Sequence, residues 1–151
     1  MILYLDTSAL VKRYFREPFS DDIIDRWKSA NQIVTSFVAY AETVASIYRK
    51  KREEDLGDTL VRKIKDSFQQ DWMTFIRVEV NDELNTYIDR VIGNHQLRGF
   101  DAIHLASAIV IQENIPDDFL FACFNDQLAR AARLEDLETF PQEENGGREL
   151  N

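Results

Sequence analysis

Short apolar runs alternate with longer amphipathic segments along most of this chain, and this alternation limits the folds that it can adopt. Strands interleaved with helices are typical of a parallel sheet, because two parallel strands need a long crossover between them. The runs with strand character are residues 2–5, 33–36, 73–79, 119–123 and, more weakly, 137–140. Their mostly apolar composition is typical of strands that are buried on both faces. The sequence therefore predicts a three-layer α/β/α fold with a central, mostly parallel sheet of four to five strands.

Helical periodicity fills the segments between these runs. We expect helices at residues 8–15, 20–29, 37–52, 56–70, 82–95, 101–113 and 127–134. The segment 101–113 is apolar almost all round, which predicts a helix buried against the sheet. In the segment 37–52, helical spacing predicts a buried face made of Phe37, Val38, Ala41, Val44, Ala45 and Tyr48.

The length of the chain, 151 residues, is enough for one domain with its own core. We expect that domain to span residues 1–140, followed by a polar, glycine-containing tail at 141–151 that is disordered. The single cysteine, Cys123, lies in an apolar run and is expected to be a buried apolar side chain. One cysteine allows no internal disulfide and no cysteine-based metal site.

The charge of the chain restricts how it can bind nucleic acid. It has 18 Lys and Arg against 27 Asp and Glu, a net charge of −9. Phosphate contacts rely on Lys and Arg, so a nucleic-acid substrate would need a local basic patch or a bridging metal. No apolar stretch approaches the ~18 residues that span a bilayer, and Asp6 comes too early for a signal peptide. We therefore expect a cytoplasmic protein without a membrane partner.

Aspartates stand where strands turn into helices. Asp6 and Asp126 each follow a predicted strand, so a parallel sheet would bring both to its carboxyl edge, where ligands bind in α/β folds. Asp101 opens the buried helix but follows no strand, and the sequence alone does not place it at that edge. Each of the three has an alternative interpretation as a helix N-cap, because Asp oxygens accept backbone N–H bonds there.

A glutamate in the helix 37–52 adds a fourth carboxylate. Glu42 falls on the margin of the predicted buried face, where it either extends to solvent or points inward to join the aspartates. Four converging carboxylates would repel one another unless a divalent cation neutralised them. Oxygen-only ligands favour Mg²⁺ or Mn²⁺ over zinc. Such an ion can bind a phosphodiester and activate a water for its hydrolysis.

Ordered motifs give the chain a family resemblance. Asp6-Thr-Ser-Ala-Leu-Val-Lys, Glu42, Leu97-Arg-Gly-Phe-Asp-Ala-Ile-His-Leu-Ala-Ser-Ala and Asn125-Asp126-Gln-Leu-Ala-Arg-Ala-Ala occur in this order between Met1 and about Phe140. The set resembles a PIN domain, and most closely the VapC toxins of toxin–antitoxin pairs. The resemblance implies a metal-dependent endoribonuclease that hydrolyses RNA, a VapB-like antitoxin that blocks its cleft, and a homodimer.

The resemblance also implies roles for individual residues. Asp6, Glu42, Asp101 and Asp126 would hold one or two Mg²⁺ or Mn²⁺ ions. Ser8 matches a small hydroxyl residue of the family and would bond a carboxylate or a metal-bound water, with helix capping as the alternative. Phe124 departs from the family pattern, which often has Ser or Thr at this position. This departure leaves open how strong a ligand Asp126 is.

We expect structural rather than catalytic roles for the two histidines. His104 lies one turn beyond Asp101 on the apolar helix, so we expect a hydrogen-bonded core histidine rather than a ligand or general base. His95 is expected at a helix end in contact with solvent, where a cation suits the helix dipole.

Two groups of basic residues are candidates for RNA contact. Arg49 and Lys50 belong to the densest basic stretch, but acidic residues are interleaved with it, so a solvated helical surface is the alternative. Lys12 and Arg13 lie closer to the presumed cleft.

Three rival functions remain after these observations. A PIN-like interaction module without catalytic activity would keep the fold and bind metal too weakly, and Phe124 favours it. A phosphatase or phosphotransfer domain fits less well, because it would need a second Asp where Ser8 stands or an acidic pair on the first strand. A DNA nuclease would share the chemistry, and only an assay on both polymers separates it from a ribonuclease.

Overall fold

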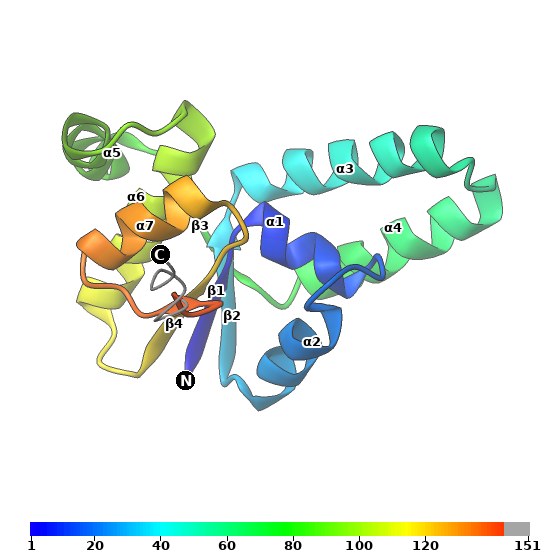
Figure 1. Cartoon of the computed structure of the whole chain (residues 1–151), viewed down its shortest axis with the longest axis horizontal. Helices are drawn as coiled ribbons and strands as arrows, with labels where there is room; N and C mark the ends of the chain where they lie inside the picture. Colours follow the sequence, from blue (N-terminus) through cyan, green and yellow to red (C-terminus); the bar gives the residue numbers. More distant parts are fainter. Residues whose placement is uncertain (144–151) are drawn as a thin grey trace, which may run out of the picture.

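The computed structural model describes residues 1–143 and contains one five-stranded sheet (Figure 1). Its strands are β1 (Ile2–Leu5), β2 (Gln32–Ser36), β3 (Ile76–Val78), β4 (Phe119–Ala122) and β5 (Thr139–Phe140). They are ordered β3-β2-β1-β4-β5, and every neighbouring pair is parallel. The predicted parallel sheet is confirmed. The strand order reverses between β1 and β4, and ligands bind in α/β sheets at the carboxyl end of such a point.

Helices connect the strands. They are α1 (Thr7–Leu10), α2 (Ser20–Ser29), α3 (Val38–Glu54), α4 (Asp58–Trp72), α5 (Asp82–Asn94), α6 (Gly99–Asn114) and α7 (Asp126–Leu134). The first predicted helix is much shorter than expected, because α1 gives way to a 3₁₀ turn at Val11–Arg13. None of the helices in the described part of the chain combines the length and the apolar character needed to cross a bilayer.

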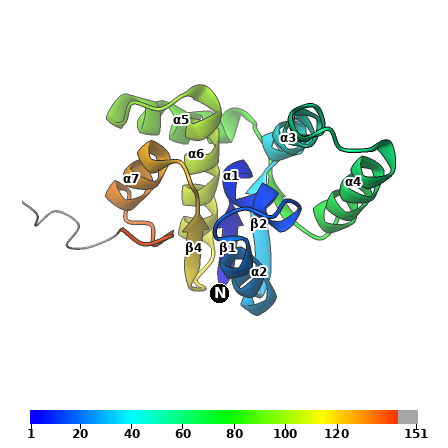
Figure 2. The ribbon, with the colours of Figure 1, turned by 45° about the vertical axis from the view of Figure 1, so that its right-hand side comes forward.

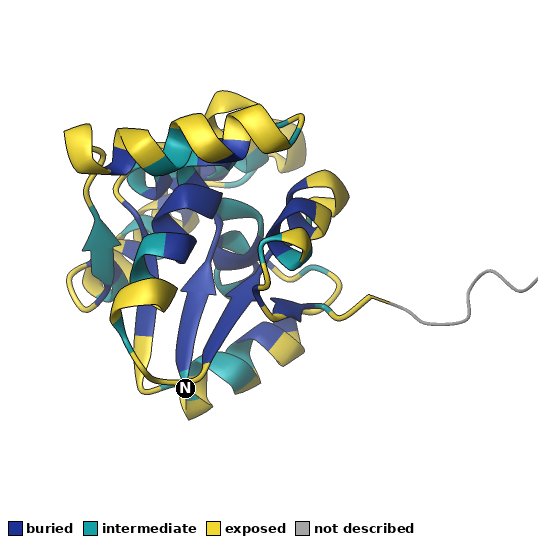
Figure 3. Cartoon of the chain, turned by 90° about the vertical axis from the view of Figure 1, so that its left-hand side faces the viewer, coloured by how far each residue is buried: buried dark blue, intermediate teal, exposed yellow. Residues whose placement is uncertain are grey.

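The sheet separates two hydrophobic cores. Side chains alternate across a strand, so Tyr4 of β1 packs in the core beneath α6 and α7, while Leu3 and Leu5 pack in the core beneath α1, α2 and α4. Figure 2 shows α5, α6 and α7 on one side of the sheet and α2, α3 and α4 on the other. Strands β1, β2, β4 and β5 are mostly buried between helices whose outer sides are exposed, whereas β3 is only partly buried (Figure 3). The predicted three-layer arrangement is confirmed.

The buried face of α3 is not the predicted one. Ala39, Thr43 and Ile47 are fully buried, whereas Phe37 and Tyr48 are exposed. The reason is tertiary: much of α3 packs on α1 and α4 rather than on the sheet, and the α3–α4 pair extends away from the body (Figure 1). Thr43 Oγ1 is buried without a hydrogen-bond partner among residues 1–143. Because the polar Thr43 lies in the middle of the buried face, the pattern of hydrophobic residues did not predict that face.

The predicted disordered tail, 141–151, lies for the most part outside the described residues. Pro141, Gln142 and Glu143 follow β5 without regular secondary structure. The domain limits at residues 1–140 stay a prediction.

Candidate metal and nucleic-acid site

The first carboxylate of the site is held at the end of β1. Asp6 is the N-cap of α1 and is only 4% exposed. Its Oδ1 accepts hydrogen bonds from the backbone N–H of Ala9 at 3.0 Å and from the Ser8 hydroxyl at 2.7 Å. Burial raises the pKa of Asp6, although His104 and these two hydrogen bonds lower it in part. Asp6 is thus both a cap and a desolvated carboxylate that a nearby cation would stabilise.

Glu42 joins this carboxylate from α3. Its Oε1 accepts a hydrogen bond from the Thr7 hydroxyl at 2.6 Å and lies 2.8 Å from Nε2 of His104. Burial raises the pKa of Glu42, but these hydrogen bonds outweigh burial, and the net shift is downward. Within the described residues both bonds end on Oε1, so Oε2 has no partner. The side chain points toward the sheet edge and does not extend along the surface as the alternative interpretation required.

A buried histidine connects Glu42 to the core. His104 Nδ1 lies 2.9 Å from the Tyr4 hydroxyl, and both side chains are almost fully buried. Burial raises the pKa of Tyr4 well above its ordinary value, so the phenol keeps its proton. The phenol therefore donates to Nδ1, and Nε2–H donates to Glu42, an assignment inferred from the bonding pattern. His104 is a hydrogen-bonded core residue, as predicted, but it also orients a carboxylate of the site.

Asp101 approaches the same histidine from α6. It is the third residue of that helix, whose N-cap is Arg98, so the N-cap interpretation of Asp101 is wrong. Burial raises the pKa of Asp101, His104 lowers it, and Glu42 raises it again. Asp101 and His104 are three residues apart on α6 and so lie on the same face of that helix. His104 Nε2 in turn lies 2.8 Å from Glu42 and 3.5 Å from the hydroxyl of Thr7, the residue after Asp6. Three segments far apart in the sequence therefore meet at one edge of the sheet.

Asp126 is placed differently from the other three. The N-cap of α7 is Asn125, whose side chain accepts from the backbone of Leu128, so the N-cap interpretation of Asp126 is wrong as well. Asp126 is exposed and lines a cavity of about 360 Å³ together with Phe124 and Arg130. None of Asp6, Glu42 and Asp101 lines that cavity.

The donor set is compatible with a hard divalent cation. Asp6, Glu42 and Asp101 supply only oxygen ligands, which Mg²⁺ and Mn²⁺ prefer. Within residues 1–143, no group of three or more His, Cys, Asp or Glu side chains is arranged to hold one ion. Mg²⁺ usually keeps several waters and binds proteins through one or two carboxylates. The residues therefore fit an ion that is held by two carboxylates and water.

An open cleft of about 520 Å³ lies beside these carboxylates. Thr7, Ser8, Glu42 and Phe124 line it together with two cations, Lys12 and Arg49. Each cation comes from a different predicted basic group.

The other two basic candidates do not line the cleft and are engaged in ion pairs. Arg13 donates to Asp71 at 2.8 Å, and Lys50 pairs with Glu17 at 3.2 Å and with Glu54 at 3.7 Å. The pair between Lys50 and Glu54 is of the i,i+4 type that the solvated-surface alternative expected. Lys12 is paired as well, with Glu17 at 3.3 Å, but it lines the cleft together with Arg49. Lys12 and Arg49 are therefore the better placed pair for contact with a phosphate by their position, and Arg49 alone of the four candidates has no ion pair within residues 1–143.

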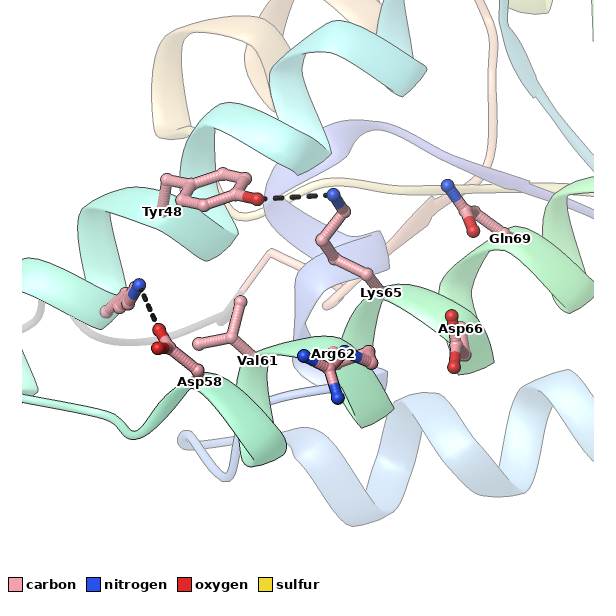
Figure 4. A pocket seen from close by; sticks show the side chains of 8 residues that line it. Tyr48, Asp58, Val61, Arg62, Lys65, Asp66 and Gln69 are labelled. Atoms are coloured by element: carbon pink, nitrogen blue, oxygen red, sulfur yellow. Dashed lines mark hydrogen bonds and ion pairs between the residues drawn. The ribbon is translucent and has the colours of Figure 1, made fainter.

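A second groove of about 290 Å³ lies between α3 and α4, away from the carboxylates (Figure 4). The ammonium of Lys65 donates to the Tyr48 hydroxyl across it at 3.2 Å, and Lys51 pairs with Asp58 at 2.6 Å. None of the four predicted carboxylates lines this groove.

His95 is less accessible than expected. It is the C-cap of α5, as predicted, but its side chain is only 11% exposed, because Nε2 lies 2.8 Å from a carboxylate oxygen of Glu135. No pattern in the sequence indicates this pair, because its partners are 40 residues apart. Thr7 was missed as well, although it stands between the two site residues Asp6 and Ser8.

Comparisons with known proteins identify the family of the chain. A family model described as PIN domain matches residues 3–134. The chain is 28% identical over 110 residues to Ribonuclease VapC45 of Mycobacterium tuberculosis, which covers 73% of this chain and 76% of that protein.

Several solved structures share the fold. FitAcB from Neisseria gonorrhoeae superposes with a TM-score of 0.64 at 14% identity, over 93% of this chain and 96% of that one. VapBC2 from Rickettsia felis, bound to a DNA fragment from its promoter, superposes with a TM-score of 0.62 at 16% identity, over 92% and 97%. The expected fold, with its central parallel sheet, is confirmed.

Proposed function

Because the chain belongs to the PIN domain family, we propose that it is an endoribonuclease that depends on Mg²⁺ or Mn²⁺ and acts as the toxin of a toxin–antitoxin pair. One observation carries the proposal: Glu42 lies 2.8 Å from His104 of α6 and lines an open cleft at the carboxyl end of β1, where the buried Asp6 begins α1. The name of the VapC45 relative supports RNA as the substrate.

The residues of the chain would divide the work as follows. Asp6 and Asp101 would hold the cation, because their charged forms are destabilised by burial and gain most from it. Glu42, which His104 and Thr7 orient, would use its unpartnered Oε2 to bind the cation or to align the attacking water. When bound, the ion would lower the pKa of a water and stabilise charge on the phosphodiester. The reaction is hydrolysis without a covalent enzyme intermediate.

The substrate would bind in the cleft beside Glu42. Lys12 and Arg49 line it and would face the phosphates. The protein has a net charge of −9, so these local cations, together with the metal, would have to overcome repulsion of the whole polyanion.

The proposed partners follow from the structural relatives. These relatives include VapBC2 from Rickettsia felis and a toxin–antitoxin complex from Klebsiella pneumoniae. We therefore propose a VapB-like antitoxin that covers the cleft, and a homodimer as the state of this chain.

A PIN-like interaction module without catalytic activity is the second candidate. It is favoured by the exposed position of Asp126 next to Phe124 and by the lack of a three-residue metal cluster within residues 1–143. Calorimetric titration with Mn²⁺ separates the two candidates, because only the enzyme requires saturable binding that is lost with Asp6→Asn.

The decisive experiment is a cleavage assay with single-stranded RNA and DNA of the same sequence. Wild-type protein is expected to cut RNA with Mg²⁺ or Mn²⁺ and to stop in excess chelator, with activity restored when the metal is returned. Cleavage that persists in excess chelator would contradict any role of a metal. Preferential cutting of DNA would favour the DNA-nuclease alternative.

A further inference from the structure

An aromatic cluster lies beside the candidate site and has no part in the proposed chemistry. Phe19 and Phe124 have ring centroids 5.3 Å apart, and both rings contact Phe140 edge-on, at 6.2 and 6.1 Å. Phe140 is buried, but Phe19 is 47% exposed. The cluster therefore presents an aromatic surface to solvent on a buried base.

The backbone holds Phe19 in an unusual conformation. Its φ is 72° and its ψ is 6°, the left-handed region that bulky side chains rarely adopt. This residue ends the loop before α2, where the Ser20 hydroxyl donates to the carbonyl of Phe15 at 3.1 Å and accepts from the N–H of Glu17 at 2.9 Å. Strained residues persist only where the surroundings determine them and are concentrated at ligand sites. The loop therefore keeps an exposed aromatic ring against Phe124 at a cost in backbone energy.

Phe124 connects this cluster to the candidate site. Its backbone N–H donates to the Ser8 hydroxyl at 2.9 Å, and that hydroxyl donates to Asp6 at 2.7 Å. Its side chain lines both the cleft beside Glu42 and the cavity of about 360 Å³ that contains Phe19. A single RNA strand bound along the cleft beside Glu42 would therefore pass over Phe124 and reach that cavity.

Cations surround the aromatic cluster. The ammonium of Lys12 lies 4.3 Å from the centre of the Phe124 ring, and the guanidinium of Arg26 lies 4.2 Å from that of Phe140. Arg130 and Arg133 line the cavity together with two acids, Asp126 and Glu143.

The two arginines of the cavity differ in their contacts. Arg133 donates to the Thr139 hydroxyl at 3.2 Å and pairs with Glu143 at 3.7 Å. Arg130 is exposed and has no ion pair or side-chain hydrogen bond within residues 1–143. An aromatic face bordered by an unpaired arginine has the composition of a single-stranded nucleic-acid site, where bases stack and cations contact the backbone.

We infer that Phe19 and Phe124 form a base-stacking subsite for one unpaired base of the RNA substrate, with Arg130 on the adjoining phosphate. This inference rests on the proposed ribonuclease function and extends it to substrate choice. The subsite takes unpaired RNA, because a base within a duplex cannot expose its face to an aromatic side chain. Phe124, which departs from the family pattern, is then a determinant of substrate binding rather than a defect of the metal site.

The test removes each of the two stacking partners in turn, the aromatic ring of Phe19 in the protein and a base in the RNA. Phe19→Leu keeps an apolar side chain but removes the aromatic face, whereas Phe19→Trp keeps that face. Affinity for a short, labelled single-stranded RNA is measured by fluorescence anisotropy in chelator, and cleavage by the same variants is measured with Mn²⁺. The measurements are repeated with a series of RNAs of the same sequence, each of which lacks the base at one position. Met73→Ala is the matched control, because Met73 is 70% exposed and precedes β3, at the opposite edge of the sheet.

The expected results are specific to stacking. Phe19→Leu should weaken binding about 5- to 150-fold, the effect of losing one base–aromatic contact, while Phe19→Trp and Met73→Ala should bind as the wild type does. One abasic position should weaken binding to the wild type by a similar factor and have little further effect on Phe19→Leu. Arg130→Gln should weaken binding to intact and abasic RNAs equally, because it removes a phosphate contact.

Three outcomes would overturn the inference. Wild-type cleavage with an unchanged Phe19→Leu variant would reject the subsite and leave the ribonuclease function in place. Equal losses for Phe19→Leu on intact and abasic RNA would assign the ring a structural role only. A wild type that neither binds nor cuts RNA would reject the proposed function and the subsite with it. Circular dichroism shows whether Phe19→Leu folds. If it does not, the deciding measurement is the binding of Phe19→Trp and Arg130→Gln to the intact and abasic RNAs.

Discussion

The carboxyl ends of β1 and β4 are neighbours in the sheet, where Leu5 pairs with Ala122, yet their aspartates have different surroundings. Asp6 is itself the N-cap of α1, so its carboxylate turns inward and is buried. After β4 the cap is Asn125, and Asp126 is the next residue, exposed to solvent. Whether an acid is buried or exposed at this edge therefore depends on which residue caps the following helix.

The two ends also differ in what supports them. Asp6 is hydrogen-bonded by Ser8 and by the α1 backbone, and His104 lies close enough to lower its pKa. Around Asp126 the cavity is lined by the aromatic rings of Phe19 and Phe124, by Arg130 and Arg133, and by a second acid, Glu143. The comparison suggests a division of roles, with chemistry at the end of β1 and substrate contact at the end of β4.

Asp6→Asn should have the largest effect on that division. Cleavage of RNA should fall by more than the roughly 10- to 100-fold that loss of a supporting partner of a metal ligand costs. Asn is an equally good N-cap, so the fold should be retained. Initial rates with Mn²⁺ and a thermal melt measure the two properties, and cleavage at the wild-type rate would remove Asp6 from the mechanism.

Asp126→Asn should lower the cleavage rate less, by about 10-fold, because the carboxylate is exposed and lines a different cavity from Glu42. The same assay measures it beside Asp6→Asn. Equal losses in the two variants would break the comparison and make Asp126 a full member of the metal site.

Ser8→Ala should damage the connection between the two ends. The hydroxyl accepts from Phe124 and donates to Asp6, so its removal leaves the Phe124 N–H without its partner. The free energy of unfolding should fall by about 1–3 kcal/mol, as measured with urea. The control is Ser29→Ala, which removes an exposed hydroxyl that bonds the carbonyl of Arg26 and should change stability by less than about 0.5 kcal/mol. Matching effects in both variants would show that Ser8 does not couple the ends.

The smallest effect concerns the pH dependence of stability in metal-free protein. The pKa of Asp6 is raised in the fold above its ordinary value of 3.8, so the folded state prefers the protonated carboxyl. The resulting stabilisation is complete below pH 3.8 and is lost as the pH rises through the folded pKa. Asp6→Asn should therefore gain stability relative to the wild type as the pH increases over this range. Urea unfolding at a series of pH values measures the difference, and a difference that shrinks with pH would contradict the desolvation of Asp6.

The sequence by itself determined the architecture, because periodicity is a local property of the chain. Apolar runs at residues 2–5 and 119–123 predicted buried parallel strands, and the interleaved helical patterns predicted the three layers. The motif around Asp6 indicated one edge of the sheet as the place to look for a site.

Only the tertiary structure decided how the site is built. His104 meets Glu42 across 62 positions of the chain, and Phe124 meets Ser8 across 116, distances over which no periodic pattern carries information. The buried face of α3 escaped prediction for the same reason, because its partners α1 and α4 could not be chosen from the helix alone. Burial, hydrogen bonds and pKa values depend on which segments become neighbours, and that is set by packing of the whole chain.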